Sequence, residues 1–249
     1  MLKIFPINNF PIIKKDDNLA ELILQGIENN ATEIKDFDII IIAQTIISRA
    51  EGQIINLDEV EPSEFAVEIA NQGKKDPKYV EMILREAKNI CKNRNGVLIT
   101  ETKHGFVCAN SGIDRSNVPG ENTISLLPEN PDKSAKEIRM YIQNRCKKKI
   151  AVLISDTHNR PFRLGAINIA IGCSGIDPVK NYINKTDLFG YKLKSSSISL
   201  ADQLCSAAGL VMGESDEGNA VIVIRGLKFK QKEISAKALI RPEERDYFR

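Results

Sequence analysis

The sequence is poor in the residues that build disulfide frameworks and structural zinc sites. Its 249 residues include no tryptophan, two histidines and five cysteines, which are Cys91, Cys108, Cys146, Cys173 and Cys205. The cysteines are widely spaced and no CxxC pair occurs, which argues against a zinc knuckle and against a disulfide framework. We therefore expect buried free thiols in the reducing cytoplasm.

Charge of one sign and long apolar runs are also missing. Lys and Arg number 35 against 33 Asp and Glu, so the net charge of +2 creates no overall field that would attract nucleic acid. No segment approaches the roughly 20 apolar residues that cross a bilayer, and the first residues lack the pattern of a signal peptide. These absences predict a globular cytoplasmic protein with no nucleic-acid or membrane partner.

The fingerprints of the common nucleotide and nucleophile sites are absent as well. The sequence has no GxxxxGK(S/T), which excludes a P-loop, and no GxGxxG after a strand, which is the Rossmann fingerprint. It has no GxSxG, and no cysteine lies in an obviously electropositive surrounding. Any catalytic chemistry must therefore come from other polar side chains.

The apolar patterns that are present predict a mixed fold. We expect strands in four apolar runs, at residues 2–5, 38–43, 150–154 and 220–224, and a hairpin of residues 96–102 and 105–109. Helical spacing predicts five helices, which begin near Asp17, Pro62, Asp76, Ser134 and Leu200. The elements alternate without the rhythm of a doubly wound sheet, so the predicted fold class is α+β (mixed α/β). We take residues 1–249 as one unit that can divide into two discontinuous lobes.

Local signals also predict where these helices begin and end. Asp17 is expected to cap the first helix, and Ser134 with Glu137 matches a capping box for the fourth. The helix that begins at Asp76-Pro77 carries its apolar stripe as far as Cys91.

Four polar clusters follow directly on apolar strands or helices, where rigid scaffolds present reactive side chains. They are "QTIISRAEG" (44–52), "NSGIDRSN" (110–117), "SDTHNR" (155–160) and "MGESDEGN" (212–219). Asp114, Asp156 and Glu214 offer hard oxygen ligands and Thr157 adds a hydroxyl, a set that suits Mg²⁺ or Mn²⁺ carrying phosphates. Each acid alone also suits a turn or cap, and "GESDEG" suits either a phosphate-binding loop or an acidic surface loop.

The stretch "SDTHNRPFR" leaves several interpretations open. His158 could act as a base, although a polar loop residue near an active site is the favoured interpretation. His104, at the turn of the predicted hairpin, is expected to be exposed to solvent. Arg160 and Arg163 could hold carboxylates or phosphates bidentately or form surface ion pairs, and we favour the first.

Taken together, the clusters resemble one protein family. "QTIISRAEG", "NSGIDRSNV", "SDTHNRPFRLGAINIAIG", "DLFGYKL" and "MGESDEGNAVIVIRG" occur in the order and approximate spacing of the coenzyme F420-0:L-glutamate ligases, gamma-glutamyl ligases of a deazaflavin coenzyme. The resemblance runs from the N-terminal "FPI…FPII" to about Gly226. It implies a homodimer with a fold of the family's own. It also implies a GTP-dependent ligase that activates the phospholactyl carboxylate of F420-0 as an acyl phosphate, which the amine of L-glutamate attacks, and that then adds a second glutamate through the gamma carboxyl.

The resemblance also assigns roles to residues. Asp114 and Asp156 resemble ligands of a first divalent cation, Mg²⁺ or Mn²⁺, and Thr157 and Glu214 those of a second, with a potassium ion as a further possibility. Asp156 and Thr157 are thereby placed at the catalytic centre. The residues that align with the family's GTP contacts are Phe10, Pro11, Ile12, Ile13, Gln44, Thr45, Arg49, Asn117, Met212, Gly213, Glu214, Ser215, Asp216, Glu217, Gly218 and Asn219.

Three positions depart from the family pattern. Gln44-Thr45 and Arg49 stand where Ser-Thr and then Lys are typical, and Asn159 stands where Gly is common. An arginine fork replaces the point charge of a lysine, so the phosphate contacts at this position differ. The C-terminal nitroreductase-like domain of some relatives is not expected here.

Two alternative functions stay open beside the ligase. One is a related ligase that glutamylates another carboxylate acceptor, and the other is a non-catalytic protein that binds a nucleotide or a deazaflavin. All four residues that the resemblance assigns to cations are present, which favours an enzyme over a binding protein.

Overall fold

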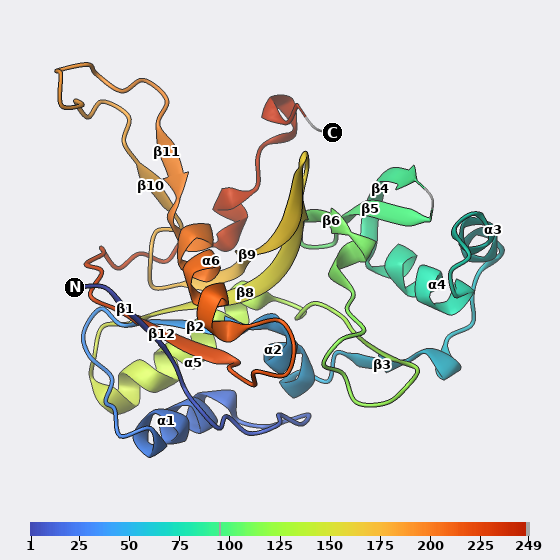
Figure 1. Cartoon of the computed structure of the whole chain (residues 1–249), viewed down its shortest axis with the longest axis horizontal. Coiled ribbons are helices and arrows are strands. Elements are labelled where there is room, and N and C mark those ends of the chain that lie inside the picture. Colours follow the sequence, from blue (N-terminus) through green and yellow to red (C-terminus); the bar gives the residue numbers. More distant parts are fainter. Residues whose placement is uncertain (95, 248–249) are drawn as a thin grey trace.

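The computed structural model describes residues 1–94 and 96–247, and a five-stranded sheet forms the centre of its larger part (Figure 1). The strands lie in the order β1 (Lys3–Pro6), β12 (Val221–Arg225), β2 (Ile39–Ala43), β8 (Ala151–Arg160) and β9 (Arg163–Ser174). β2 and β8 are parallel, and the other neighbours are antiparallel. The predicted α+β class is confirmed.

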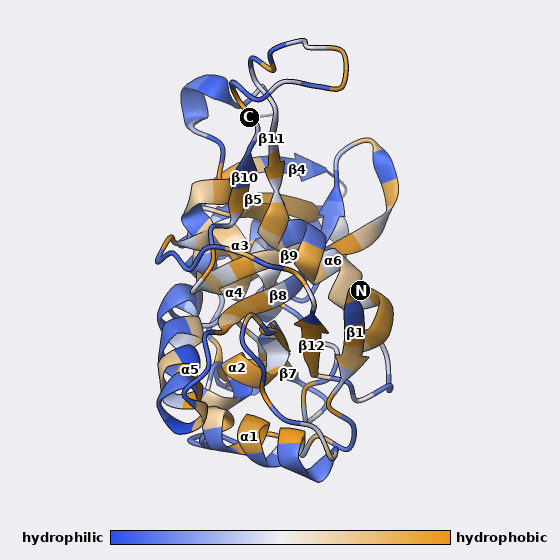
Figure 2. Ribbon diagram, turned by 90° about the vertical axis from the view of Figure 1, so that its left-hand side faces the viewer, coloured by the Kyte–Doolittle hydropathy of each residue, from blue (hydrophilic) through white to orange (hydrophobic). Residues whose placement is uncertain are grey.

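The sheet is buried on both faces. Ile40 and Ile42 of β2 pack on one face with α1 (Leu19–Asn29) and α5 (Pro131–Cys146), whereas Ile39 and Ile41 pack on the other with α6 (Leu200–Met212). All four isoleucines are fully buried, which explains why this strand is a continuous apolar run rather than an alternating one. Figure 2 shows the same pattern in colour, with apolar central strands and helices α1 and α5 that carry both apolar and polar stretches.

A second apolar core lies among residues 54–126. Leu57, Val80, Ile83, Leu98 and Ile124 are among its fully or almost fully buried members. The elements around it are β3 (Ile54–Asn56), η1 (Leu57–Glu59), α3 (Glu64–Gly73), α4 (Pro77–Glu86), β4 (Ala87–Arg94), β5 (Val97–Thr102), β6 (Val107–Ala109), η2 (Asn110–Gly112) and β7 (Thr123–Ser125). They lie beside the five-stranded sheet, which is built from segments before and after them (Figure 1).

A long arm projects from the molecule between β10 (Val179–Asn181) and β11 (Ser197–Ser199) (Figure 1). Its connecting segment exposes Leu188 and Phe189 almost completely. The chain then continues through α6 and β12 to two short turns of helix, η3 (Ala236–Leu239) and η4 (Glu243–Arg245). Among the described residues, no helix is both long and apolar enough to cross a membrane.

Two elements differ from the sequence-based expectation. Residues 44–50, predicted as the polar end of a strand, form helix α2 (Gln44–Ala50) immediately after β2. The helix predicted to reach Cys91 ends at Glu86, and the residues that follow form β4, which pairs with β5. Pairing with β5 supplies backbone hydrogen bonds that the helical spacing of single residues could not reveal.

Two predicted helix caps are wrong. Asn18, not Asp17, caps α1 by accepting the Glu21 N–H, while Asp17 accepts the N–H of Lys14. Helix α5 begins three residues before Ser134, where Pro131 occupies its first turn behind the cap Asn130. Proline at this position has a φ angle already suited to a helix, so the helix starts there and the predicted capping box falls inside it.

All five cysteines are free, as expected, but they are not all buried. Cys108, Cys173 and Cys205 lie in the interior, whereas Cys146 is half-buried and Cys91 is exposed on β4. Cys91 is exposed because it lies on β4, at the surface. The predicted helix would instead have placed it on a buried apolar stripe.

Candidate active site

The four polar clusters lie on the wall of a single cleft with a volume of about 1290 Å³. Its wall includes residues of α2, which directly follows β2, residues of β8, and the loop between α6 and β12. The residues predicted as nucleotide or metal ligands that line it are Phe10, Pro11, Ile12, Ile13, Gln44, Thr45, Arg49, Asp114, Asn117, Asp156, Thr157, Met212, Gly213, Glu214, Ser215, Asp216, Glu217, Gly218 and Asn219. The fold thus gathers segments from between residues 10 and 220 around one space.

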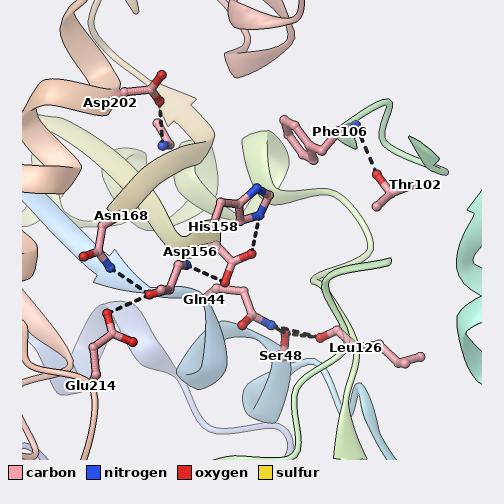
Figure 3. Close-up of polar contacts among 12 residues, drawn as sticks. Gln44, Ser48, Thr102, Phe106, Leu126, Asp156, His158, Asn168, Asp202 and Glu214 are labelled. Atoms are coloured by element: carbon pink, nitrogen blue, oxygen red, sulfur yellow. Dashed lines mark hydrogen bonds and ion pairs between the residues drawn. The ribbon is translucent and has the colours of Figure 1, made fainter. Parts of the chain in front are cut away.

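Thr157 lies on strand β8, not after it, because the strand continues to Arg160. Its hydroxyl donates to Glu214 Oε1 at 2.8 Å and accepts from Asn168 Nδ2 at 3.1 Å (Figure 3). Because Asn168 donates to the Thr157 oxygen, the hydroxyl proton of Thr157 is available for the bond to Glu214. Two of the predicted cation ligands are joined by this hydrogen bond.

Asn168 was not recognised from the sequence. It is the residue of β9 that pairs with Thr157 across the β8–β9 hairpin, and it is buried. Helix α6 approaches it so closely that a Cβ atom on Gly209 would lie 2.7 Å from Asn168 Cγ. The register of the hairpin, which no local spacing encodes, would have been needed to find it.

Asp156 is held by its neighbours on the same strand. Its Oδ1 accepts the Thr157 N–H at 2.8 Å, and its Oδ2 lies 2.8 Å from His158 Nε2 (Figure 3). His158 is 7% exposed, so the expected polar loop residue is instead a buried strand residue. Side chains two residues apart in a strand point to the same face, which places His158 beside Asp156.

Asp114 forms a turn of the kind that its local sequence suggested. Its two carboxylate oxygens accept from the backbone N–H of Ser116 at 2.8 Å and from the Ser116 hydroxyl at 2.6 Å. A carboxylate has about four lone-pair positions, so these bonds leave room for a cation.

The loop after α6 already holds an anion of its own. The carboxylate of Glu217 accepts the backbone N–H of Ser215 at 2.8 Å, and backbone N–H groups of the loop, that of Ser215 foremost, lower the Glu217 pKa. Gly213 has a φ of +76°, and a Cβ there would collide with the Glu217 carboxylate. The backbone of this loop therefore presents N–H groups to negatively charged oxygens, as phosphate-binding loops do.

Arg49, at the end of α2, is a partly buried cation whose charge no carboxylate balances among the described residues. Its Nη2 donates to the carbonyl of Asn117, and its Nε is buried without a hydrogen-bond partner in the described part of the chain. Burial lowers the Arg49 pKa, although a guanidinium stays charged in proteins. An anion in the cleft would supply the missing partner.

Gln44 is buried and also links two parts of the fold. Its Nε2 donates to Ser48 Oγ at 2.6 Å and to the carbonyl of Leu126 at 3.0 Å (Figure 3). Because both amide hydrogens are engaged, the side-chain oxygen is the part of the amide that is left to contact a ligand.

Several residues noted in the sequence do not line the cleft. Arg160 donates to the carbonyls of Leu164 and Gly165 and so closes the β8–β9 hairpin, and neither Arg160 nor Arg163 lies on the wall of the cleft. His104 is half-buried, against expectation, because its Nε2 hydrogen-bonds the carbonyl of Pro128 at 2.9 Å.

Comparison with known proteins identifies the family. The sequence profile described as F420-0:Gamma-glutamyl ligase matches residues 8–226, a range that spans all four polar clusters. The chain belongs to this family. The coenzyme F420:L-glutamate ligase of Methanocaldococcus jannaschii is 48% identical over 96% of this chain and 94% of its own length. The proteins of the same name from Methanothermobacter thermautotrophicus and Archaeoglobus fulgidus are 40% and 38% identical and cover 100% of this chain, with 99% and 96% of their own lengths.

The F420-0:gamma-glutamyl ligase fold thus brings hard oxygen donors together without a dense acidic cluster. Within residues 1–94 and 96–247, no three His, Cys, Asp or Glu side chains lie close enough together to share one metal ion. Mg²⁺ commonly takes only one or two carboxylates and completes its shell with water and substrate phosphates. Asp114, Asp156 and Glu214, with the hydroxyl of Thr157, therefore fit Mg²⁺ or Mn²⁺ by donor chemistry.

Proposed function

We propose that the chain is a GTP-dependent ligase that joins L-glutamate to coenzyme F420-0 and then adds further glutamate through the gamma carboxyl, in coenzyme F420 biosynthesis. One observation carries the proposal: four polar clusters from distant parts of an F420-0:gamma-glutamyl ligase chain line one cleft of about 1290 Å³. Small-molecule sites usually measure about 300–1,000 Å³. A larger cleft suits an enzyme that binds a nucleotide and a carboxylate acceptor at the same time.

The proposed reaction has two steps. An oxygen of the terminal F420-0 carboxylate attacks the γ-phosphorus of GTP, the bond to GDP breaks, and an acyl phosphate forms. The amine of L-glutamate then attacks the acyl carbon, loses a proton and displaces inorganic phosphate, which leaves with the former carboxylate oxygen. Neither step needs a protein nucleophile. The thiol of Cys108 lines the cleft, but burial raises its pKa to about 12. Cys108 is therefore a poor candidate for a nucleophile.

The oxygen donors of the cleft would hold the cations. Asp114 and Asp156 are proposed for one Mg²⁺ or Mn²⁺ ion and Thr157 with Glu214 for a second, and a potassium ion is proposed as a further cofactor. When bound, such ions would neutralise charge on the reacting phosphates. The chain's own contribution is to hold these donors still, through the contacts to Asp156 and Thr157 described above.

The nucleotide is proposed to lie between α2 and the loop of residues 213–218. Arg49 brings a partly buried positive charge with no acidic partner among the described residues, and the loop brings backbone N–H groups, of which that of Ser215 now binds the Glu217 carboxylate and would exchange it for a phosphate oxygen. Both features favour a polyanion such as a triphosphate. The choice of GTP rests on the family resemblance.

We also propose that the chain forms a homodimer. Leu188 and Phe189 on the β10–β11 arm are 98% and 96% exposed, which is unusual for large apolar side chains that lie next to each other. Packing of the arm on a second copy would bury them. Light scattering should give the mass of a dimer, and a Leu188→Ser/Phe189→Ser variant should shift toward the monomer; a wild-type monomer contradicts the proposal.

The proposed activity is tested by incubating the protein with GTP, Mg²⁺, L-glutamate and F420-0. We expect mass spectrometry to show a product heavier by one glutamyl unit, and we expect Asp156→Ala to abolish its formation. Glu137→Ala removes an exposed carboxylate on α5, away from the cleft, and should leave turnover unchanged. GTP consumption with another acceptor but not with F420-0 would indicate the related ligase instead. Nucleotide binding without any turnover would indicate a non-catalytic binding protein.

A further inference from the structure

A second, smaller pocket of about 190 Å³ lies next to the main cleft. His158 lines both cavities, so its side chain is part of the wall of each. Because His158 Nε2 lies 2.8 Å from Asp156 Oδ2, the inner end of the small pocket is close to the proposed reacting centre. Figure 3 labels Asp202 and Phe106, two further residues of this pocket, on opposite sides of His158 in this view.

The size of this pocket restricts what it can hold. Its volume is well below the roughly 300–1,000 Å³ of sites for drug-sized ligands, and a nucleotide or a deazaflavin would not fit. A single amino acid would. The apolar part of the wall, from Phe106 and Ile240, suits the methylene groups of such a ligand.

The wall also carries one negative and one positive side chain with atoms available to hydrogen-bond a ligand. Asp202 uses Oδ1 to accept the N–H of Ala170 at 2.9 Å, and its Oδ2 has no partner among the described residues. The guanidinium of Arg241, on the same wall, has no hydrogen bond or ion pair in the described part of the chain. Asp246, also on the wall, has an interaction of its own. A free carboxylate oxygen and a free guanidinium on one small pocket match an ammonium and a carboxylate of the same ligand.

The position of Asp202 indicates how the ligand would be oriented. Asp202 binds Ala170 on β9, and Ala170 pairs with Ser155 on β8, the residue before Asp156. Neighbouring strands are about 4.8 Å apart, so Asp202 is anchored beside the strand pair that carries Asp156. Arg241 lies on the C-terminal segment that follows η3. An amino acid held this way has its amino group beside β9, at Asp202, and a carboxylate at the C-terminal segment, at Arg241.

We propose that this pocket, between His158, Asp202 and Arg241, is the subsite for L-glutamate, the amino-acid substrate. Asp202 holds the amino group and Arg241 holds a carboxylate. The inference rests on the proposed ligase function and adds to it the place from which the amine approaches the acyl phosphate.

The test is steady-state kinetics of the full chain, in which the KM for L-glutamate and the KM for GTP are measured separately. Arg241→Gln removes the guanidinium, and Asp202→Asn removes the charge while it keeps Oδ1 for the Ala170 N–H. Arg245→Gln, on the same C-terminal segment but off the pocket wall, is the matched control. A hydrogen bond to a charged group contributes about 1.5–3 kcal/mol, so we expect Arg241→Gln and Asp202→Asn each to raise the KM for L-glutamate about 10-fold or more. The KM for GTP should not change in any of the three.

An unchanged KM for L-glutamate in both Arg241→Gln and Asp202→Asn overturns the subsite, as does an equal rise in Arg245→Gln. Arg241 is exposed, so its replacement should leave the fold intact, and a thermal melt checks this for each variant. Failure of the wild-type chain to form any glutamyl product is a different result, which overturns the proposed function and the subsite with it.

Discussion

The contact between Gly209 and Asn168 allows a quantitative test of how the site is held together. A Cβ atom added at Gly209 would lie 2.7 Å from Asn168 Cγ and closer still to its Oδ1. In a helix where the new methyl group meets no obstacle, replacement of glycine by alanine stabilises the helix by about 1 kcal/mol. Here the same change should force Asn168 away, at an overpacking cost of about 1–3 kcal/mol and a further 0.5–1.5 kcal/mol for its hydrogen bond to Thr157. After subtraction of the gain in helix propensity, we expect Gly209→Ala to lower the free energy of unfolding by about 0.5–3.5 kcal/mol.

The double variant Gly209→Ala/Asn168→Ala separates the two contributions. With the shorter side chain at position 168, the added methyl group has space and its helix propensity is regained. Urea denaturation followed by circular dichroism should therefore show the double variant more stable than the sum of the single changes by more than about 1 kcal/mol. Additivity of the two single variants within about 0.5 kcal/mol would refute the reasoning.

Three further expectations follow from named contacts. Gly213→Ala, which would place a side chain at φ +76° against the Glu217 carboxylate, should weaken GTP binding at least several-fold in calorimetry, and unchanged affinity would contradict the role of this loop. His158→Met should weaken Mn²⁺ binding, measured by electron paramagnetic resonance, because it removes the contact that holds Asp156. His158→Gln, which keeps a donor near the same place, should restore much of it, and equal affinities in both variants would argue against this contact. Hydrogen bonds at the cap of α3 lower the Glu81 pKa to about 2, so Glu81 stabilises the fold above pH 4.5 and loses this effect as the pH falls toward 2. Acid titration of Glu81→Gln should show a smaller loss of stability in that window, and an unchanged profile would be evidence against it.

The sequence predicted the centre of the fold better than its margins. The run of isoleucines at 39–42 and the valine-isoleucine run of β12 are buried strands, as expected, because only a two-faced sheet can bury every residue of such a run. Strand β4 was missed because its sequence, AKNICKNR, has no alternating pattern and its pairing with β5 is a tertiary effect.

In the site, too, residues marked by local sequence were predicted, and residues that depend on strand pairing were not. Asp156 and Thr157 stood out because acidic and hydroxyl side chains follow an apolar strand, and both line the cleft. His158 and Asn168 were misjudged or missed because their importance depends on the β8–β9 hairpin. The hairpin carries β8 past residue 154 and sets Asn168 opposite Thr157. The motif shows that these residues are close in sequence, whereas only the register shows which ones touch.

The most direct test of the central proposal follows an oxygen atom. With both carboxylate oxygens of the terminal F420-0 carboxyl labelled with ¹⁸O, transfer of the γ-phosphoryl group to that carboxylate predicts one ¹⁸O in the released inorganic phosphate. The other ¹⁸O should stay in the new amide. Formation of the glutamyl product with no ¹⁸O in phosphate, or with the label in GMP, would contradict an acyl phosphate formed from GTP.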